Sequence, residues 1–152
     1  MDNTTLEHYL AHYCAATLLG EKSASLVSLP REECARIGLQ LREYNRQLGP
    51  KGLVFTYPMG ENLRAKLNRL QARFAEGGGF PHEIGLFLGY PPEDVRAFVA
   101  TGGAGCKLCG YWKVYHNVEA ARACFARYDA CRDRLCRAIA QGTTISQLLC
   151  AA

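Results

Sequence analysis

Two short apolar runs with a helical pattern between them constrain the fold of this chain more than any other feature. Residues 25–29 and residues 53–57 have the composition of buried strands, and Pro30 bounds the first of them. Between the runs, apolar side chains recur at the spacing of one helix face: Cys34, Ile37, Leu41, Tyr44 and Leu48. A strand, a helix and a strand within about thirty residues form a right-handed crossover, so we expect two neighbouring parallel strands.

Further elements complete the expected fold. A first helix opens on a capping box of Thr4 and Glu7, and another covers residues 63–74. Residues 108–115, rich in aromatic and β-branched types, predict a third strand, and Asn117 caps a last long helix. We therefore predict an α/β or α+β fold, with a small sheet of about three strands, the first two parallel, covered by about five or six helices.

Residues 80–95 are the densest run of turn-forming and titratable residues in the chain. As a strand, the run would place His82 and every second residue after it on one face. As two short helices, it would turn at residues 89–91 and begin again at Pro92. Gly85 argues against a helix interior by about 0.5–1 kcal/mol relative to alanine. We prefer the two helices, because the apolar side chains at 84, 87 and 88 then form one stripe.

Length and charge indicate the class of protein. The 152 residues are expected to form a single domain, residues 1–152, in a cytoplasmic protein. A net charge of +4 is too small to indicate nucleic acid, although it suits an anionic small molecule. The sequence has no long apolar run for a membrane and no basic leader, and eight cysteines without a leader indicate reduced thiols.

Three segments carry a family resemblance: residues 14–22, residues 80–91 and residues 110–115. On these, the chain resembles a bacterial family known only as a domain of unknown function (number 3793), over about residues 6–142. The resemblance implies a small cytosolic protein and implies no activity. The family's first motif pairs a histidine with the cysteine matched by Cys14, but Tyr13 stands at that histidine position, so a mechanism needing an adjacent His-Cys pair is not carried over.

His82 and Glu83 are the leading candidates for a functional pair. In the first turn of a short helix they would lie beside free peptide N–H groups and a positive dipole, which suits a phosphate or carboxylate ligand. Glu83 could act as a base or orient an imidazole. The alternative is that Glu83 caps its own helix and His82 bonds a loop carbonyl.

Cys14 is a candidate nucleophile, with Lys22 and Ser25 shortly beyond it as candidate ligand-binding residues. A thiol reacts as thiolate, and the C-terminal end of a helix disfavours that form, so Cys14 would need the charge of Lys22 over it. A packed, inert thiol is the alternative. Lys113 and Tyr115 share one face of the expected third strand, which gives either a ligand platform or a solvated face with a cation over a ring.

The paired cysteines Cys106 and Cys109 have the spacing of a metal or redox motif, but a structural zinc needs a second pair, so we expect no metal site. The leading functional hypothesis is a small, anionic ligand bound in a pocket lined by Lys22, His82, Glu83 and Lys113, with catalysis and any cofactor left open. The alternative is a non-enzymatic interaction or regulatory module, in which residues 81–100 present Tyr90 and Phe98 to a partner protein. A weaker alternative is a thiol or metal sensor.

Overall fold

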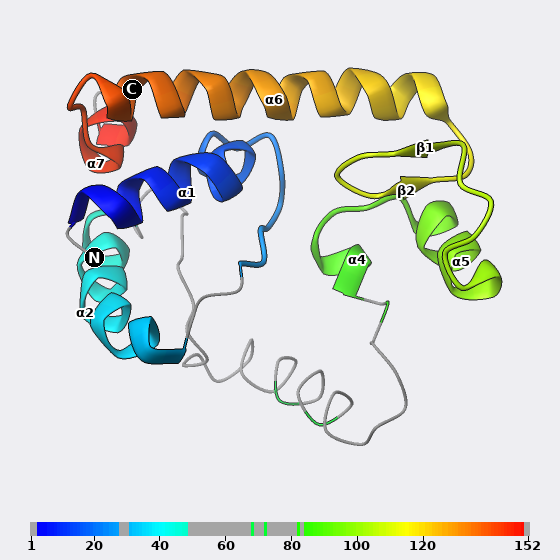
Figure 1. Cartoon of the computed structure of the whole chain (residues 1–152), viewed down its shortest axis with the longest axis horizontal. Coiled ribbons are helices and arrows are strands. Elements are labelled where there is room, and N and C mark those ends of the chain that lie inside the picture. The colour runs from blue at the N-terminus through cyan, green and yellow to red at the C-terminus, as the bar shows by residue number, and fades with distance from the viewer. Residues whose placement is uncertain are drawn as a thin grey trace. The chain divides into compact units, whose positions relative to one another are not determined.

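The computed structural model describes residues 3–27, 31–48, 68, 72, 82 and 84–150. The chain divides into two compact units, one of Met1–Tyr57 with Arg127–Ala152 and the other of Pro58–Ala126. Figure 1 labels the elements of both units, six helices and two strands among the described residues. The single domain expected from the chain length stays a prediction.

The first unit is built from helices. It holds α1 (Asn3–Leu18), α2 (Arg31–Leu48), the later turns of α6 (Val118–Ala140) and α7 (Ile145–Cys150). The short helix α7 packs against both α1 and α2. The helices meet around a continuous apolar core: Leu6, Leu10, Ala11, Cys14, Ala15, Leu18, Tyr44, Leu48, Leu135, Ile139, Ile145 and Leu149. The helical patterns predicted for α1, α2 and α6 are confirmed.

Two local motifs set the ends of helices in the first unit. Helix α1 closes with a Schellman motif, because Gly20 takes a φ of 79° and the N–H groups of Gly20 and Glu21 donate to Thr17 and Ala16. Helix α7 opens with a capping box, in which the Thr144 N–H donates to Gln147 Oε1 and the Gln147 N–H donates to Thr144 Oγ1.

The second unit joins two short helices to a hairpin. Helices α4 (Ile84–Phe87) and α5 (Pro92–Thr101) pack together, and α5 also packs on β2 (Lys113–Val114), the partner of β1 (Leu108–Cys109). The first turns of α6 follow, where Asn117 Oδ1 accepts the N–H of Ala120 as the predicted N-cap.

The predicted sheet is wrong. Within the described part of the chain the sheet has two antiparallel strands, with Leu108 opposite Val114 and Cys109 opposite Lys113, and it has no parallel pair. Residues 25–27 form no strand, and the strand expected at residues 53–57 lies outside the described residues. Residues 108–115 were expected to run straight but fold back as a hairpin.

Two short helices at residues 84–101 are confirmed, which overturns the alternative of a strand. Gly85, which argued against a helix, is required for the packing of α4. A Cβ on Gly85 would lie 2.9 Å from Val95 Cγ2 and 3.1 Å from Tyr90 Cδ2, so α4 approaches α5 closely only without a side chain there. No helix among the described residues is both long and apolar enough to cross a bilayer.

Candidate functional site

The predicted site residues fall on both units. Cys14, Lys22 and Ser25 belong to the first unit, whereas His82, Lys113 and Tyr115 belong to the second. Glu83 lies outside the described residues. The pocket expected from all of these residues together therefore stays a prediction, and each unit is considered by itself.

Cys14 sits in the core of the first unit with 9% of its surface exposed. Burial raises the pKa of its thiol to about 11, although the nearby charge of Lys22 acts in the opposite direction. The ammonium group that a reactive Cys14 would need is thus present, but desolvation outweighs it. At neutral pH the thiol is protonated, so we leave Cys14 out of the site proposed below.

Ser25 has a local partner in the same unit. Its hydroxyl lies 2.8 Å from the hydroxyl of Thr17 on α1. This contact holds the segment after Gly20 against the end of the helix, a role that requires no ligand.

The C-terminal end of α5 gathers the three described candidates of the second unit. The Lys113 ammonium group donates a 2.7 Å hydrogen bond to the carbonyl of Gly103 and lies 5.6 Å from the ring centroid of Phe98. The imidazole of His82 meets the same ring edge-on, with the centroids 4.8 Å apart. The hydroxyl of Tyr115 lies 3.3 Å from Oγ1 of Thr101. The ring that Lys113 meets is that of Phe98 on α5, and the ligand platform expected at Lys113 stays a prediction.

The backbone at Gly103 allows this arrangement. Its φ of 86° lies in the left-handed region, and an added Cβ would come within 3.0 Å of Phe98 Cε2 and 3.1 Å of Lys113 Nζ. The carbonyls at the end of a helix carry partial negative charge, which favours an ammonium group beside them. Lys113 is therefore held in place by a carbonyl and an aromatic ring, both of which are uncharged.

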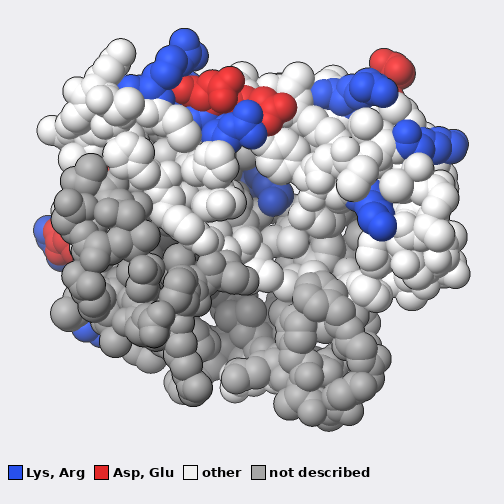
Figure 2. All heavy atoms as spheres, viewed as in Figure 1, with Lys and Arg blue, Asp and Glu red and all other residues white. Residues whose placement is uncertain are grey.

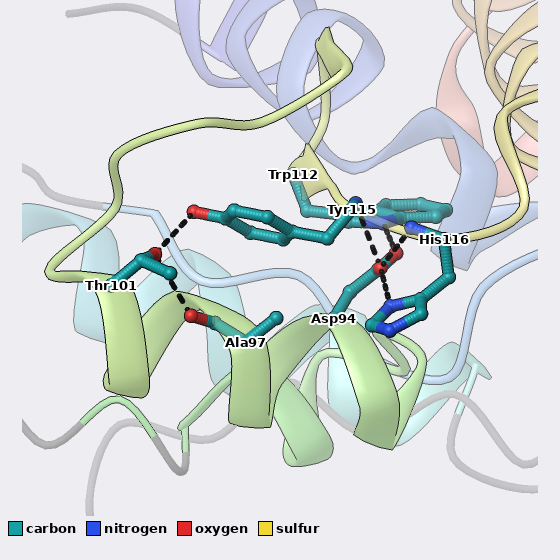
Figure 3. A network of polar contacts seen from close by, with 6 residues as sticks. All are labelled: Asp94, Ala97, Thr101, Trp112, Tyr115 and His116. Atoms are coloured by element: carbon teal, nitrogen blue, oxygen red, sulfur yellow. Dashed lines mark hydrogen bonds and ion pairs between the residues drawn. The ribbon is translucent and has the colours of Figure 1, made fainter.

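Sequence reasoning missed Asp94, a buried side chain of the second unit with four polar contacts. Figure 3 shows its carboxylate, 4% exposed, between the first turns of α5 and the segment after β2. One oxygen accepts the indole N–H of Trp112 at 2.8 Å. The other accepts the backbone N–H groups of Tyr115 (2.9 Å) and His116 (3.1 Å) and lies 3.1 Å from Nδ1 of His116.

These hydrogen bonds decide the charge of Asp94. Desolvation raises the pKa of its carboxyl, but the bonds from Tyr115, Trp112 and His116 outweigh it, so the pKa lies below its ordinary value. This role is hard to predict from the sequence, because Glu93 and Asp94 are both acidic residues in the first turn of a helix. Only the fold distinguishes the buried one from the exposed one.

A second buried carboxylate, Glu7, joins helices of the first unit. It is 3% exposed, accepts a hydrogen bond from the hydroxyl of Tyr44 on α2, and accepts the N–H of Ile145 at 2.5 Å. Both of its oxygens are thus used between α1, α2 and α7. This position differs from the capping role predicted for Glu7 and indicates a structural function.

The remaining candidates have ordinary surroundings. Cys106 is half-buried and Cys109 is exposed, both as free thiols, and the described residues contain no group of three side chains able to hold a metal ion. In Figure 2 acidic side chains lie among the basic ones on the face drawn. Along α6, for example, Arg132 pairs with Asp129 at 2.9 Å. Arg132 on α6 therefore has an acidic partner on its own helix.

The chain matches a known protein family. The model of a family described as "Protein of unknown function (DUF3793)" matches residues 53–149. This match covers α4, α5, the hairpin and α6, whereas the residues around Cys14 lie outside it. No curated protein and no solved structure matches the chain.

Proposed function

This chain belongs to the DUF3793 family of proteins of unknown function, and we propose that its second unit binds a small anionic ligand at Lys113. The observation that carries the proposal is the state of the Lys113 ammonium group. It is half-buried and fixed by the Gly103 carbonyl and the Phe98 ring, and no carboxylate of the described residues pairs with it.

An ammonium group in this position has binding capacity left. It offers three N–H donors, one of which is used by Gly103, so the other two can serve a phosphate or carboxylate oxygen. Its side chain is already ordered, which lowers the entropy lost on binding. His82 contacts the same Phe98 ring, so its imidazole and the Lys113 ammonium group both lie beside one side chain of α5. We expect an affinity of about 1 mM for inorganic phosphate, equal to about −4 kcal/mol.

The test is the thermal stability of matched variants in inorganic phosphate, at ionic strength held constant with chloride. Lys113→Met keeps an unbranched side chain and removes the charge. Lys107→Met makes the same change at an exposed lysine of the same unit and is the control. Phosphate at a hundred times its dissociation constant stabilises the folded state by about 2.7 kcal/mol, or roughly 5–10 °C in melting temperature.

The proposal predicts that the wild type and Lys107→Met show this rise and that Lys113→Met does not. Lys113→Met is also expected to melt lower without phosphate, since the buried Gly103 carbonyl loses its donor. The melting temperature of each variant in phosphate is therefore compared with that of the same variant without phosphate. An equal rise in all three proteins would show that Lys113 is only a helix cap.

A second candidate function is protein interaction, and its surface differs from the one expected. Tyr90 stacks on Trp112 at 5.3 Å and Phe98 contacts His82 and Lys113, so both rings pack within the unit. The half-exposed apolar side chains of α4 and α5 are instead Leu86, Phe87 and Val99. If they bind a partner or a second copy, Phe87→Ser will lower the mass measured by sedimentation.

A further inference from the structure

His116 has a feature that the proposed anion site does not use. Its imidazole is 53% exposed, yet Nδ1 lies 3.1 Å from the buried carboxylate of Asp94. The same carboxylate oxygen also accepts the backbone N–H of His116, so Asp94 holds both the backbone and the ring of this residue. Within the described part of the chain, Nε2 of this ring makes no hydrogen bond. Figure 3 shows the ring on Asp94, at the end of α5 opposite to Thr101.

The carboxylate determines which ring nitrogen carries the proton. Asp94 is ionised, and an ionised carboxylate only accepts hydrogen bonds. Nδ1 must then donate, which leaves the lone pair of the neutral ring on the exposed Nε2. A histidine held by a carboxylate in this way is oriented for attack, and positive charge that develops on the ring is stabilised by the carboxylate.

We propose that His116 is a nucleophilic site whose Nε2 accepts a phosphoryl group from a small donor with a labile phosphorus–nitrogen or acyl-phosphate bond. With phosphoramidate, the Nε2 lone pair attacks phosphorus and forms a nitrogen–phosphorus bond. The donor's own phosphorus–nitrogen bond breaks, and its electron pair leaves with the nitrogen as ammonia, which takes its proton from solvent. Nδ1 keeps its proton throughout, bonded to Asp94. The inference is separate from the anion site, so either can fail alone.

The test treats the full chain with phosphoramidate at neutral pH and locates phosphorylated residues by tandem mass spectrometry over time. The chain's other three histidines, His8, His12 and His82, are internal controls. We expect His116 to react about tenfold faster than each of them or more, the factor given by a hydrogen bond to a charged group. Equal rates at all four histidines would overturn the proposal.

The role of the carboxylate is tested by Asp94→Asn, which keeps an acceptor oxygen and removes the charge. His116 should lose its advantage while the other histidines react as before. A rate at His116 that is unchanged in the folded variant would contradict the proposal. Because this variant can lose its fold, the wild type supplies an independent measurement. The imidazole ¹⁵N shifts of the neutral ring must show the proton on Nδ1, and a proton on Nε2 overturns the proposal.

Discussion

The indole Nε1 of Trp112 donates a 2.8 Å hydrogen bond to Oδ2 of Asp94, and this bond joins the hairpin to the first turn of α5. Trp112 is the single tryptophan of the chain, so its fluorescence reports on this contact and on the unit that holds the proposed sites. The ring also stacks on Tyr90 and meets Phe125 edge-on at 4.6 Å, which places the contact inside an aromatic cluster.

Asp94→Ala is predicted to destabilise the second unit by roughly 3 kcal/mol, because the Trp112 indole and the backbone N–H groups of residues 115 and 116 lose their acceptor. Urea unfolding followed by Trp112 fluorescence measures the change. Glu93→Ala, the exposed neighbour in the same turn, is the control and should cost less than about 1 kcal/mol. Equal losses in the two variants would show that Asp94 acts only through the helix dipole.

The acid dependence of that contribution has a definite sign. The folded-state pKa of Asp94 lies below its ordinary value of 3.8, so the unfolded chain takes up the proton more readily. The stability from Asp94 is fully present above pH 3.8 and disappears as the pH falls through the lower folded-state pKa. The difference in unfolding free energy between wild type and Asp94→Ala should therefore persist down to pH 3.8 and shrink only in stronger acid.

Tyr44→Phe is predicted to destabilise the first unit by about 1–1.5 kcal/mol at neutral pH, since Glu7 loses one donor. Burial, together with the hydrogen bond and charge of Glu7, raises the pKa of Tyr44 above its ordinary value of 10.0. Its contribution is thus present below pH 10.0 and is lost as pH rises through the folded-state value. Denaturant unfolding followed by circular dichroism at 222 nm measures the difference, with Tyr13→Phe, 55% exposed, as the control. A difference that grows above pH 10.0 would contradict this sign.

Cys14 is predicted to react with iodoacetamide about a hundredfold more slowly than an exposed thiol, because its pKa is raised from 9.0 to about 11 and its thiolate is correspondingly rare. Mass spectrometry after brief alkylation of the native protein compares it with the exposed Cys109 and Cys150. Rapid labelling at Cys14 would restore it as a candidate nucleophile.

Gly103→Ala is predicted to cost about 1 kcal/mol more than Gly102→Ala. Both glycines have left-handed φ values, 61° for Gly102 and 86° for Gly103, so an alanine is strained at each by about 1–2 kcal/mol. Only at Gly103 would the new Cβ also meet Phe98 and Lys113. Thermal unfolding of the two variants compares the effect of these contacts, and equal stabilities would mean that the Phe98 ring and the Lys113 side chain both move aside freely.

The helices were predictable from sequence because their apolar periods and end residues are local. Asn117, for example, lies where the last long helix was expected to begin, and it caps that helix. The hairpin was not predicted, since aromatic residues at 111 and 112 suit a strand equally well. They pack instead on Phe125, and Gly110 lies so close to that ring that a Cβ would approach its Cε2 within 2.3 Å. Gly110, inside the run predicted as a strand, was the residue that could have indicated the hairpin.

The site was predictable only in part for a related reason. Lys113 and His82 were singled out by local composition, and both contact Phe98. Asp94 and His116 acquire their roles from a contact between residues 22 positions apart, which no local pattern records. Long-range hydrogen bonds of buried carboxylates depend on the tertiary fold. The bond between Glu7 and Ile145 spans a still greater sequence separation, 138 positions.

The central claim, that Lys113 binds an anion, is tested most directly by titrating inorganic phosphate into protein labelled with ¹³C at the lysine Cε and following the NMR signals of Lys113 and Lys107 together. At constant ionic strength, binding predicts a saturable shift at Lys113 with a midpoint of about 1 mM and no comparable shift at the exposed Lys107. Small, unsaturated shifts of equal size at both lysines would contradict the claim and reduce Lys113 to a helix cap.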